Sequence, residues 1–324
     1  MKRTFKAASV AAFLALLLVG VPSFISATGR SDLYYTLTSV ALLSIVSAGV
    51  WITFYIGRIN IGQGAFALLG GYASAILVTK YGVSFWLTLP FAGILCAFVS
   101  VLIGLPILRL RGVYFAMVTL TLTEVGRLLA LALPITNGAR GIVSIPLPGA
   151  ITLFGVTLVP DFATLANPRL AFYLTAVVLM AVCFACLYRL VHSRVGRICQ
   201  SLQQNEELAS SIGVDIANMR ILAYALSSFL GGIGGAMFAA ISQSIYPSTF
   251  TIADSVNFML NCFLGGLGHV LGPMLGTFVL YFGWDLLFQT GSFQLLIFSS
   301  ILIALMLVLP NGLLSIRLRG QSQG

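Results

Sequence analysis

Charged residues are scarce in this sequence, and acidic residues and histidines are the scarcest of all. The 324 residues include eight acidic residues and two histidines, and charged residues make up 8% of the chain, against about 25% in ordinary soluble domains. The sequence has no G-x-x-x-x-G-K-[ST] phosphate loop and no H-E-x-x-H zinc motif. We therefore do not expect an enzyme, nor a chain that hydrolyses ATP by itself.

Metal and nucleic-acid sites are not expected either. Cys183 and Cys186 form one C-x-x-C pair, but no second cysteine pair and no pair of histidines at zinc-binding spacing accompanies it. Cysteines inside apolar runs act as small hydrophobic residues. We therefore expect no metal and no cofactor. The formal net charge is +9, but the basic residues fall in short groups between apolar runs, which is typical of charges that orient a membrane protein. The cysteines are Cys96, Cys183, Cys186, Cys199 and Cys262.

Long apolar runs fill most of the chain. Hydrophobic residues make up 59% of it, and the mean hydropathy is +1.04. A bilayer core of about 30 Å needs about 20 helical residues for each crossing. We therefore predict an all-α, polytopic helical bundle that forms one transmembrane domain, 1–324, with about ten crossings. They are placed at 7–27, 34–56, 62–80, 84–106, 113–133, 170–190, 220–242, 254–267, 269–288 and 294–310.

Two of these crossings have an alternative. The sequence GGLGHVLGP separates the eighth from the ninth, and it also suits a tight hairpin, a broken helix or a re-entrant element. The first run, Ala7 to Ala27, follows three basic residues, as in a signal peptide. Because the run is long enough to cross a bilayer, we favour a retained helix.

The basic residues predict the orientation of the bundle. If the N-terminus is cytoplasmic, twelve of them lie inside, four lie outside, and Arg127 lies within the membrane. This bias places both termini and the polar segment Arg194 to Arg220 in the cytoplasm. The inside set is Lys2, Arg3, Lys6, Arg58, Arg109, Arg111, Arg189, Arg194, Arg197, Arg220, Arg317 and Arg319, and the outside set is Arg30, Lys80, Arg140 and Arg169.

The longest external connection runs from Pro134 to Arg169, and its five prolines exclude a long helix. Three interpretations fit this connection: it covers the external opening of the bundle, it contacts an external partner, or it is a plain structured loop.

The cytoplasmic segment 192–219 contains the signals of a short helix. Asn205 is placed to cap it, Glu206 and Glu207 lie in its first turn, and Gly213 is placed to end it. We expect eight residues in two turns. Leu208 and Ile212 are four residues apart and are expected to share a face with Ala209. That apolar face suits either a docking surface or packing against the chain's own bundle.

The fifth crossing carries Glu124 and Arg127, one helical turn apart. Ionisable groups inside a membrane are costly unless they are paired or hydrated, and the i,i+3 spacing permits a pair. A structural ion pair and the lining of a solute path both fit this pattern.

Small residues mark three further crossings. Gly62 and Gln63 begin a glycine-rich helix that can either pack closely or line a cavity. In two later crossings a small residue recurs at every fourth position, which predicts close contact between helices. These residues are Gly231, Gly235 and Ala239 in one, and Gly268, Gly272 and Gly276 in the other.

Several of these segments resemble the permease subunits of bacterial ABC importers for branched-chain amino acids, the M-type more than the H-type. The matching segments are INIGQGAFALLGGYASAIL, LRLRGVYFAMVTLTLTEVGRLL, ITNGARGIVSIP, SRVGRICQSLQQNEELASSIGVDIANMRILAYALSSFLGGIGGAMFA, FLGGLGHVLGPMLGTFV and LPNGLL. The resemblance implies that one cytoplasmic helix docks in a groove of an ATP-binding subunit. Its residues here would be Arg197, Glu206, Glu207, Leu208, Ala209 and Gly213.

The resemblance also implies the rest of the assembly: a second permease subunit, two ATP-binding subunits, an extracytoplasmic solute-binding protein and a bacterial inner membrane. Glu124 and Arg127 match charged positions of the family, whereas Gln200 and Gln203 stand where relatives have basic residues. Other cargo (urea, short amides, aromatic acids or sugars) is an alternative within the same machinery. A self-sufficient secondary transporter or channel, and a membrane-embedded transferase, are alternatives of other classes.

Overall fold

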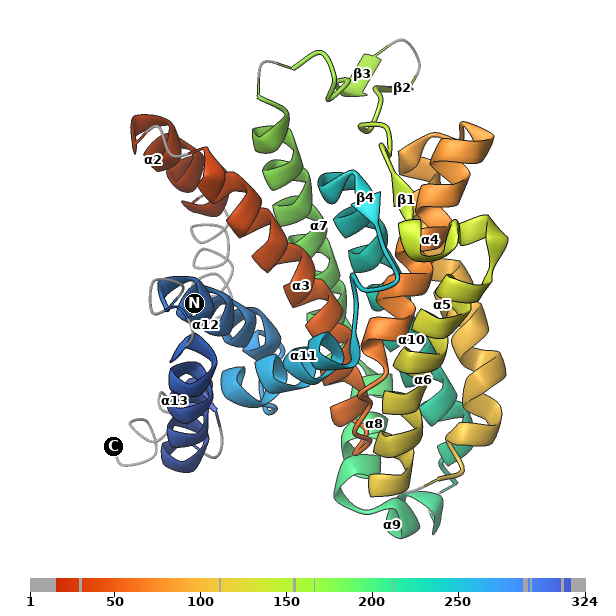
Figure 1. Ribbon diagram of the computed structural model, residues 1–324. Coiled ribbons are helices and arrows are strands. Elements are labelled where there is room, and N and C mark those ends of the chain that lie inside the picture. The colour runs from red at the N-terminus through yellow and green to blue at the C-terminus, as the bar shows by residue number, and fades with distance from the viewer. Residues whose placement is uncertain are drawn as a thin grey trace.

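The fold is a bundle of helices with a few short strands at one end (Figure 1). The computed structural model describes residues 16–28, 31–110, 112–153, 156–165, 167–211, 213–287, 291, 293–309 and 312–315. The helices in the first part of the chain are η1 (Leu16–Gly20), α2 (Val21–Thr28), α3 (Asp32–Phe54), α4 (Gln63–Tyr81), α5 (Phe85–Ile107) and α6 (Val113–Ala132). Those in the second part are α7 (Pro168–Val191), α8 (Arg194–Gln204), α9 (Glu206–Ser211), α10 (Ile216–Ser242), α11 (Ile252–Gly265), α12 (Gly272–Leu286), α13 (Gln294–Val308) and η5 (Leu313–Ser315).

The predicted all-α bundle is confirmed, and nine of the ten predicted runs coincide with helices α3 to α7 and α10 to α13. The first run lies partly outside the described residues. By length and composition, five helices in the described part of the chain are able to cross a membrane: α3, α5, α6, α7 and α10. The number of crossings stays a prediction.

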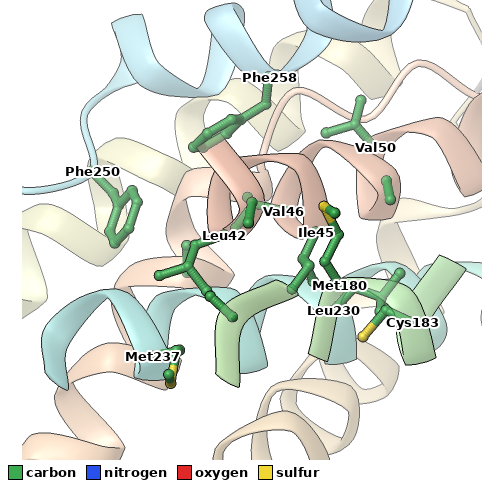
Figure 2. Close-up of a cluster of buried hydrophobic side chains, with 14 of the residues drawn as sticks. Leu42, Ile45, Val46, Val50, Met180, Cys183, Leu230, Met237, Phe250 and Phe258 are labelled. Carbon is green, nitrogen blue, oxygen red and sulfur yellow. The ribbon is translucent and has the colours of Figure 1, made fainter. Parts of the chain in front are cut away.

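Helices α3 and α10 form the centre of the bundle. Nearly every residue of α3 from Thr38 to Phe54 is buried, because α10, α7, α12 and α11 all pack against it. Figure 2 shows Leu42, Ile45, Val46 and Val50 of α3 between side chains of α7, α10 and α11. A helix that is apolar all round is expected in such a position.

Helices α10 and α4 pack so closely that their backbones lie against each other. A Cβ atom at Gly235 would overlap the carbonyl oxygen of Ala67, and one at Gly70 would overlap the backbone of Gly232. Gly231 lies against Gln63 and Phe66 in the same contact. The glycines of α10 therefore serve contact within the chain.

Helices α11 and α12 form a hairpin beside α3 (Figure 1). They contain 14 and 15 residues, so each is about 21–23 Å long at 1.5 Å per residue, less than the roughly 30 Å of a bilayer core. The two helices pack against each other, so the segment between them forms a hairpin turn. Gly272 and Gly276 lie against the backbone of α11, whereas Gly268 lies in the turn, where an added Cβ atom would have no neighbour within 4 Å, so the helix contact predicted for Gly268 is wrong within this chain.

The stretch between α6 and α7 lies at the end of the bundle opposite α8 and α9 (Figure 1). It contains the 3-10 turns η2 (Pro134–Thr136) and η3 (Gly138–Arg140) and the strands β1 (Ile142–Val143), β2 (Ile151–Leu153) and β3 (Val156–Val159). Strand β1 pairs with β4 (Ser244–Ile245), which follows α10, and β2 pairs with β3. This connection is a structured loop tied to the end of α10.

Replacing Gly235 with alanine is expected to lower the melting temperature of the detergent-purified protein, because the new methyl group would force α10 away from the Ala67 carbonyl. Overpacking of this kind costs about 1–3 kcal/mol. Gly268→Ala is the matched control and should leave the melting temperature unchanged. Equal melting temperatures for the two variants would contradict the assigned contact.

Candidate functional site

Helices α8 and α9 form a compact unit, residues 194–211, at one end of the bundle; we call it the knob (Figure 1). The hydroxyl of Ser193 accepts a hydrogen bond from the backbone N–H of Gly196 and so caps α8. Gly196 itself lies against the carbonyls of Leu190 and Val191 at the end of α7. A larger residue at 196 would not fit, so this glycine allows the chain to turn sharply out of α7.

Helix α9 begins and ends where the sequence indicates. The Asn205 side-chain oxygen accepts hydrogen bonds from the backbone N–H groups of Glu207 and Leu208, each at 3.0 Å. Gly213 follows with a φ of +85°, a value that favours glycine. The described part of the helix is Glu206–Ser211, six of the expected eight residues, and Ile212 lies outside the described residues.

The two faces of α9 differ in their surroundings. Ala209 is 2% exposed and Leu208 is 65% exposed, so the expectation that they share a face is wrong, since consecutive helical residues point about 100° apart. Glu206 and Ala209 face the bundle, whereas Glu207 and Leu208 face outward. The inner face of α9 therefore packs against the chain's own bundle, whereas docking through the outer face stays a prediction.

Helix α8 lies against the bundle through a buried thiol. Cys199 is 6% exposed, and its burial raises the pKa of the thiol. Arg197 and Gln200 are exposed and line a depression of about 650 Å³ together with Tyr55 and His269. This depression lies between α8, the end of α3 and the turn between α11 and α12.

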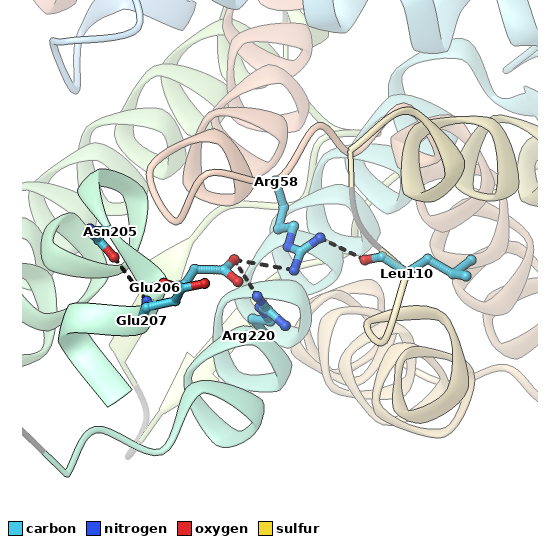
Figure 3. Close-up of polar contacts among 6 residues, drawn as sticks. All are labelled: Arg58, Leu110, Asn205, Glu206, Glu207 and Arg220. Atoms are coloured by element: carbon cyan, nitrogen blue, oxygen red, sulfur yellow. Dashed lines mark hydrogen bonds and ion pairs between the residues drawn. The ribbon is translucent and has the colours of Figure 1, made fainter. Parts of the chain in front are cut away.

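A single carboxylate ties the knob to the bundle (Figure 3). Glu206 pairs with Arg58, at 3.3 Å, and with Arg220 of α10. Arg58 is 3% exposed and also donates a hydrogen bond of 2.6 Å to the carbonyl of Leu110, which connects α5 to α6. We call Arg58, Glu206 and Arg220 the clasp. It joins four segments at the base of the knob.

A second polar cluster lies deeper, where α3 leads into α4. Gln63 is fully buried; its side-chain amide donates to the Ser227 carbonyl at 2.8 Å and accepts from the Ser227 hydroxyl at 3.0 Å. Asn60, also fully buried, donates to the same hydroxyl at 3.4 Å. Cβ atoms at Gly49 and Gly231 would clash with the Gln63 amide, so these two glycines make room for it.

This buried cluster continues into α6 and α11. The backbone N–H of Gly64 donates to the Ser255 hydroxyl at 3.0 Å, and that hydroxyl lies 3.1 Å from the hydroxyl of Thr123. The N–H of Ile61 donates to the Thr119 hydroxyl at 3.1 Å. We call Asn60, Gln63, Ser227, Thr119, Thr123 and Ser255 the buried seam. Gly62 and Gln63 are both buried, which fits the close packing that the sequence allows, and a role in the solute path stays a prediction.

Glu124 and Arg127 form a pair on the side of α6 that the bundle leaves partly uncovered. Arg127 Nε lies 3.1 and 3.0 Å from the two carboxylate oxygens of Glu124, and Arg127 Nη2 lies 2.5 Å from the first of them. The side chains are 30% and 34% exposed, respectively, for Arg127 and Glu124. The pair lies one residue along α6 from Thr123 of the buried seam.

Sequence reasoning missed the partners that organise this site. Arg58 was assigned only to membrane orientation, and Asn60, Ser227 and Gly49 were not singled out. The available signal was Arg58 and Asn60 in a short stretch between two apolar helices, because polar residues at that depth need partners.

Neutralising one member of the Glu124–Arg127 pair is expected to harm the protein more than neutralising both, because a lone charge beside hydrocarbon is the costly state. Glu124→Gln and Arg127→Gln should each lower the amount of folded protein in membranes several-fold, and the double variant should recover part of it. Equal losses in all three would argue against a mutual pair.

Removing the Glu206 carboxylate is expected to loosen the knob. In a chain whose only cysteine is Cys199, Glu206→Ala should speed labelling by a membrane-impermeant maleimide by about tenfold or more, since charge-assisted hydrogen bonds contribute about 1.5–3 kcal/mol. Glu207→Ala, on the outward side of the same helix, is the control and should leave the rate unchanged. Similar rates for both variants would show that the clasp does not hold the knob.

Comparison with known proteins supports a transport role. A family model, described as the permease component of the branched-chain amino acid transport system, matches residues 33–310. The high-affinity branched-chain amino acid transport system permease protein LivM of Escherichia coli (strain K12) is 32% identical over 274 residues, 80% of this chain and 64% of that protein. The chain thus spans less than two thirds of that relative's length.

Two further relatives extend the comparison. The LivM permease of Salmonella typhimurium (strain LT2) is 31% identical over 318 residues, 93% of this chain and 74% of that protein. A probable branched-chain amino acid transport permease protein LivH of Methanocaldococcus jannaschii is 24% identical over 286 residues, 84% of this chain and 88% of that protein. No solved structure matches the chain. With five apolar helices of spanning length among its described residues, the chain is a multi-pass membrane protein that belongs to the family of branched-chain amino acid transport system permease components.

Proposed function

We propose that this chain is a transmembrane permease subunit of an ATP-driven importer for branched-chain or related hydrophobic amino acids. The observation that carries the proposal is helix α9 of the knob, a short capped helix that is fixed to the bundle on one side and presents Glu207 and Leu208 on the other. An exposed leucine on a rigid helix suits docking into the groove of a partner. The names of the relatives support the cargo.

The partner of the knob in this proposal is a separate ATP-binding subunit. Glu207 is exposed beside Leu208 in the sequence of α9, which suits a polar rim around an apolar anchor, and Arg197 adds an exposed positive charge on α8. Closure of the ATP-binding subunits would displace the knob and so bias the bundle between two arrangements. Gly213 and the Asn205 cap keep the helix short and rigid enough to pass on that displacement.

The remaining partners follow from the family. The chain would pair with a second permease subunit, and the assembly would include two ATP-binding subunits and an extracytoplasmic solute-binding protein. The charge bias of the sequence supports a cytoplasmic position for the knob and both termini, and the bacterial relatives support an inner membrane. The structured loop between α6 and α7 then faces outward, where a solute-binding protein would meet it.

The solute path in this proposal runs along α6. This helix leaves large apolar side chains such as Tyr114, Met117 and Leu128 exposed, and the Glu124–Arg127 pair lies on the same helix. A partly exposed ion pair beside apolar side chains suits a surface that meets the second permease subunit and the passing solute. The pair neutralises itself while the path is empty.

Replacing Leu208 with aspartate is expected to abolish binding of the ATP-binding subunits, because a charge would enter the apolar contact. We would co-express the chain with candidate ATP-binding subunits, and measure co-purification and ATP-dependent uptake of leucine into vesicles. Ser210→Asp introduces the same charge elsewhere on the exposed surface of α9 and is the matched control. Unchanged co-purification with Leu208→Asp, or full uptake by this chain alone down an ion gradient, would reject the proposal.

A further inference from the structure

We propose that Arg58 is a positioning residue that transmits movement of the knob into the interior of the bundle, through the segment 57–64 that joins α3 to α4. The proposal rests on the proposed function, because it assumes that the knob receives force from an ATP-binding subunit. It adds the route by which that force reaches the helices that would open or close the path.

The first step is the contact between this segment and both helices of the knob. Gly57 has a φ of +76°, and a Cβ atom placed there would lie 3.4 Å from the Cα atom of Gln203 in α8. The next residue, Arg58, reaches Glu206 in α9. The start of the segment therefore lies beside α8 and is held by α9 through a charge.

The second step is the set of polar contacts that Arg58 makes with the rest of the bundle. Its guanidinium is buried, and it binds the Leu110 carbonyl as well as Glu206. Separating a buried guanidinium from its carboxylate is costly. A displaced α9 would therefore draw Arg58 with it more readily than it would leave Arg58 behind, and the contact with Leu110 would extend the movement to the start of α6.

The third step is the short distance along the chain from Arg58 to the buried seam. Residues 58 to 62 are not helical, so the segment is able to shift without unwinding a helix. Asn60 is two residues beyond Arg58, and Gln63 opens α4; both bind Ser227 of α10. Movement of Arg58 would thus change the hydrogen bonds between α4 and α10.

The fourth step leads to α11 and α6. Gly64 binds Ser255 of α11 through its backbone N–H, and Ser255 binds Thr123 of α6. Thr123 is the residue before Glu124. Hydrogen bonds between side chains can re-form with new partners, whereas close-packed apolar contacts resist gradual change. The bundle is therefore able to switch between two arrangements of its helices along this line of hydrogen bonds.

The test uses the complete assembly of both permeases, the ATP-binding subunits and the binding protein in liposomes. Arg58→Ala and the near-isosteric Glu206→Gln are compared with Arg194→Ala, which removes an exposed arginine from the start of α8. We expect both clasp variants to retain the ATP-binding subunits and to hydrolyse ATP, but to transport about tenfold less leucine for each ATP hydrolysed. Arg194→Ala should keep the ratio of the unmodified assembly.

The outcomes separate this inference from the proposed function. If both clasp variants keep the ratio of transport to hydrolysis, the inference is overturned while the docking role of Leu208 stands. If they lose the ATP-binding subunits, Arg58 and Glu206 are part of the docking surface and the inference is again overturned. If Arg58→Ala does not fold, Glu206→Gln alone decides the ratio. If the unmodified assembly shows no ATP-dependent uptake, the proposed function fails first.

Discussion

The Glu206 carboxylate, held between the guanidinium groups of Arg58 and Arg220, is the interaction on which the arrangement of this end of the molecule depends. It joins the knob, the segment between α3 and α4, and the first turns of α10 at one point. Buried charges are retained only when they are paired, so the three side chains constrain one another. The outer side of α9 is then free to face a partner while the inner side is fixed.

A second constraint comes from burial. Buried backbone N–H groups must find hydrogen-bond partners within the protein. Those just before α4 and in its first turn find them in side chains: Thr119 accepts from Ile61, Asn60 from Gly62, and Ser255 from Gly64. Each of these bonds replaces one that a continuous helix would have supplied. The same side chains therefore permit a break in the helix and connect α4 to α6 and α11.

The sequence predicted the helices well because apolar runs and glycine or proline boundaries are local signals. Nine of the predicted runs are helices, and Asn205 and Gly213 mark the two ends of α9 as expected. It could not predict which face of α9 turns inward, since that depends on Arg58, which is distant in sequence, and on Arg220. Gln63 was found as a polar residue among glycines, but its partner Ser227 is 164 positions away, and no local pattern joins them. Gly268 shared a period of four with Gly272 and Gly276 but fell in a turn, because periodicity alone does not show where a helix begins.

A double-mutant cycle between Glu206 of the clasp and Asn60 of the buried seam tests most directly whether the knob and the interior of the bundle act together. The quantity is the free energy of unfolding in detergent for the unmodified chain, Glu206→Gln, Asn60→Ala and the double variant. The account predicts an interaction energy of about 0.5 kcal/mol or more, as for residues that share one network. Effects that add to within about 0.3 kcal/mol would show that the clasp and the seam are independent, which would contradict the account.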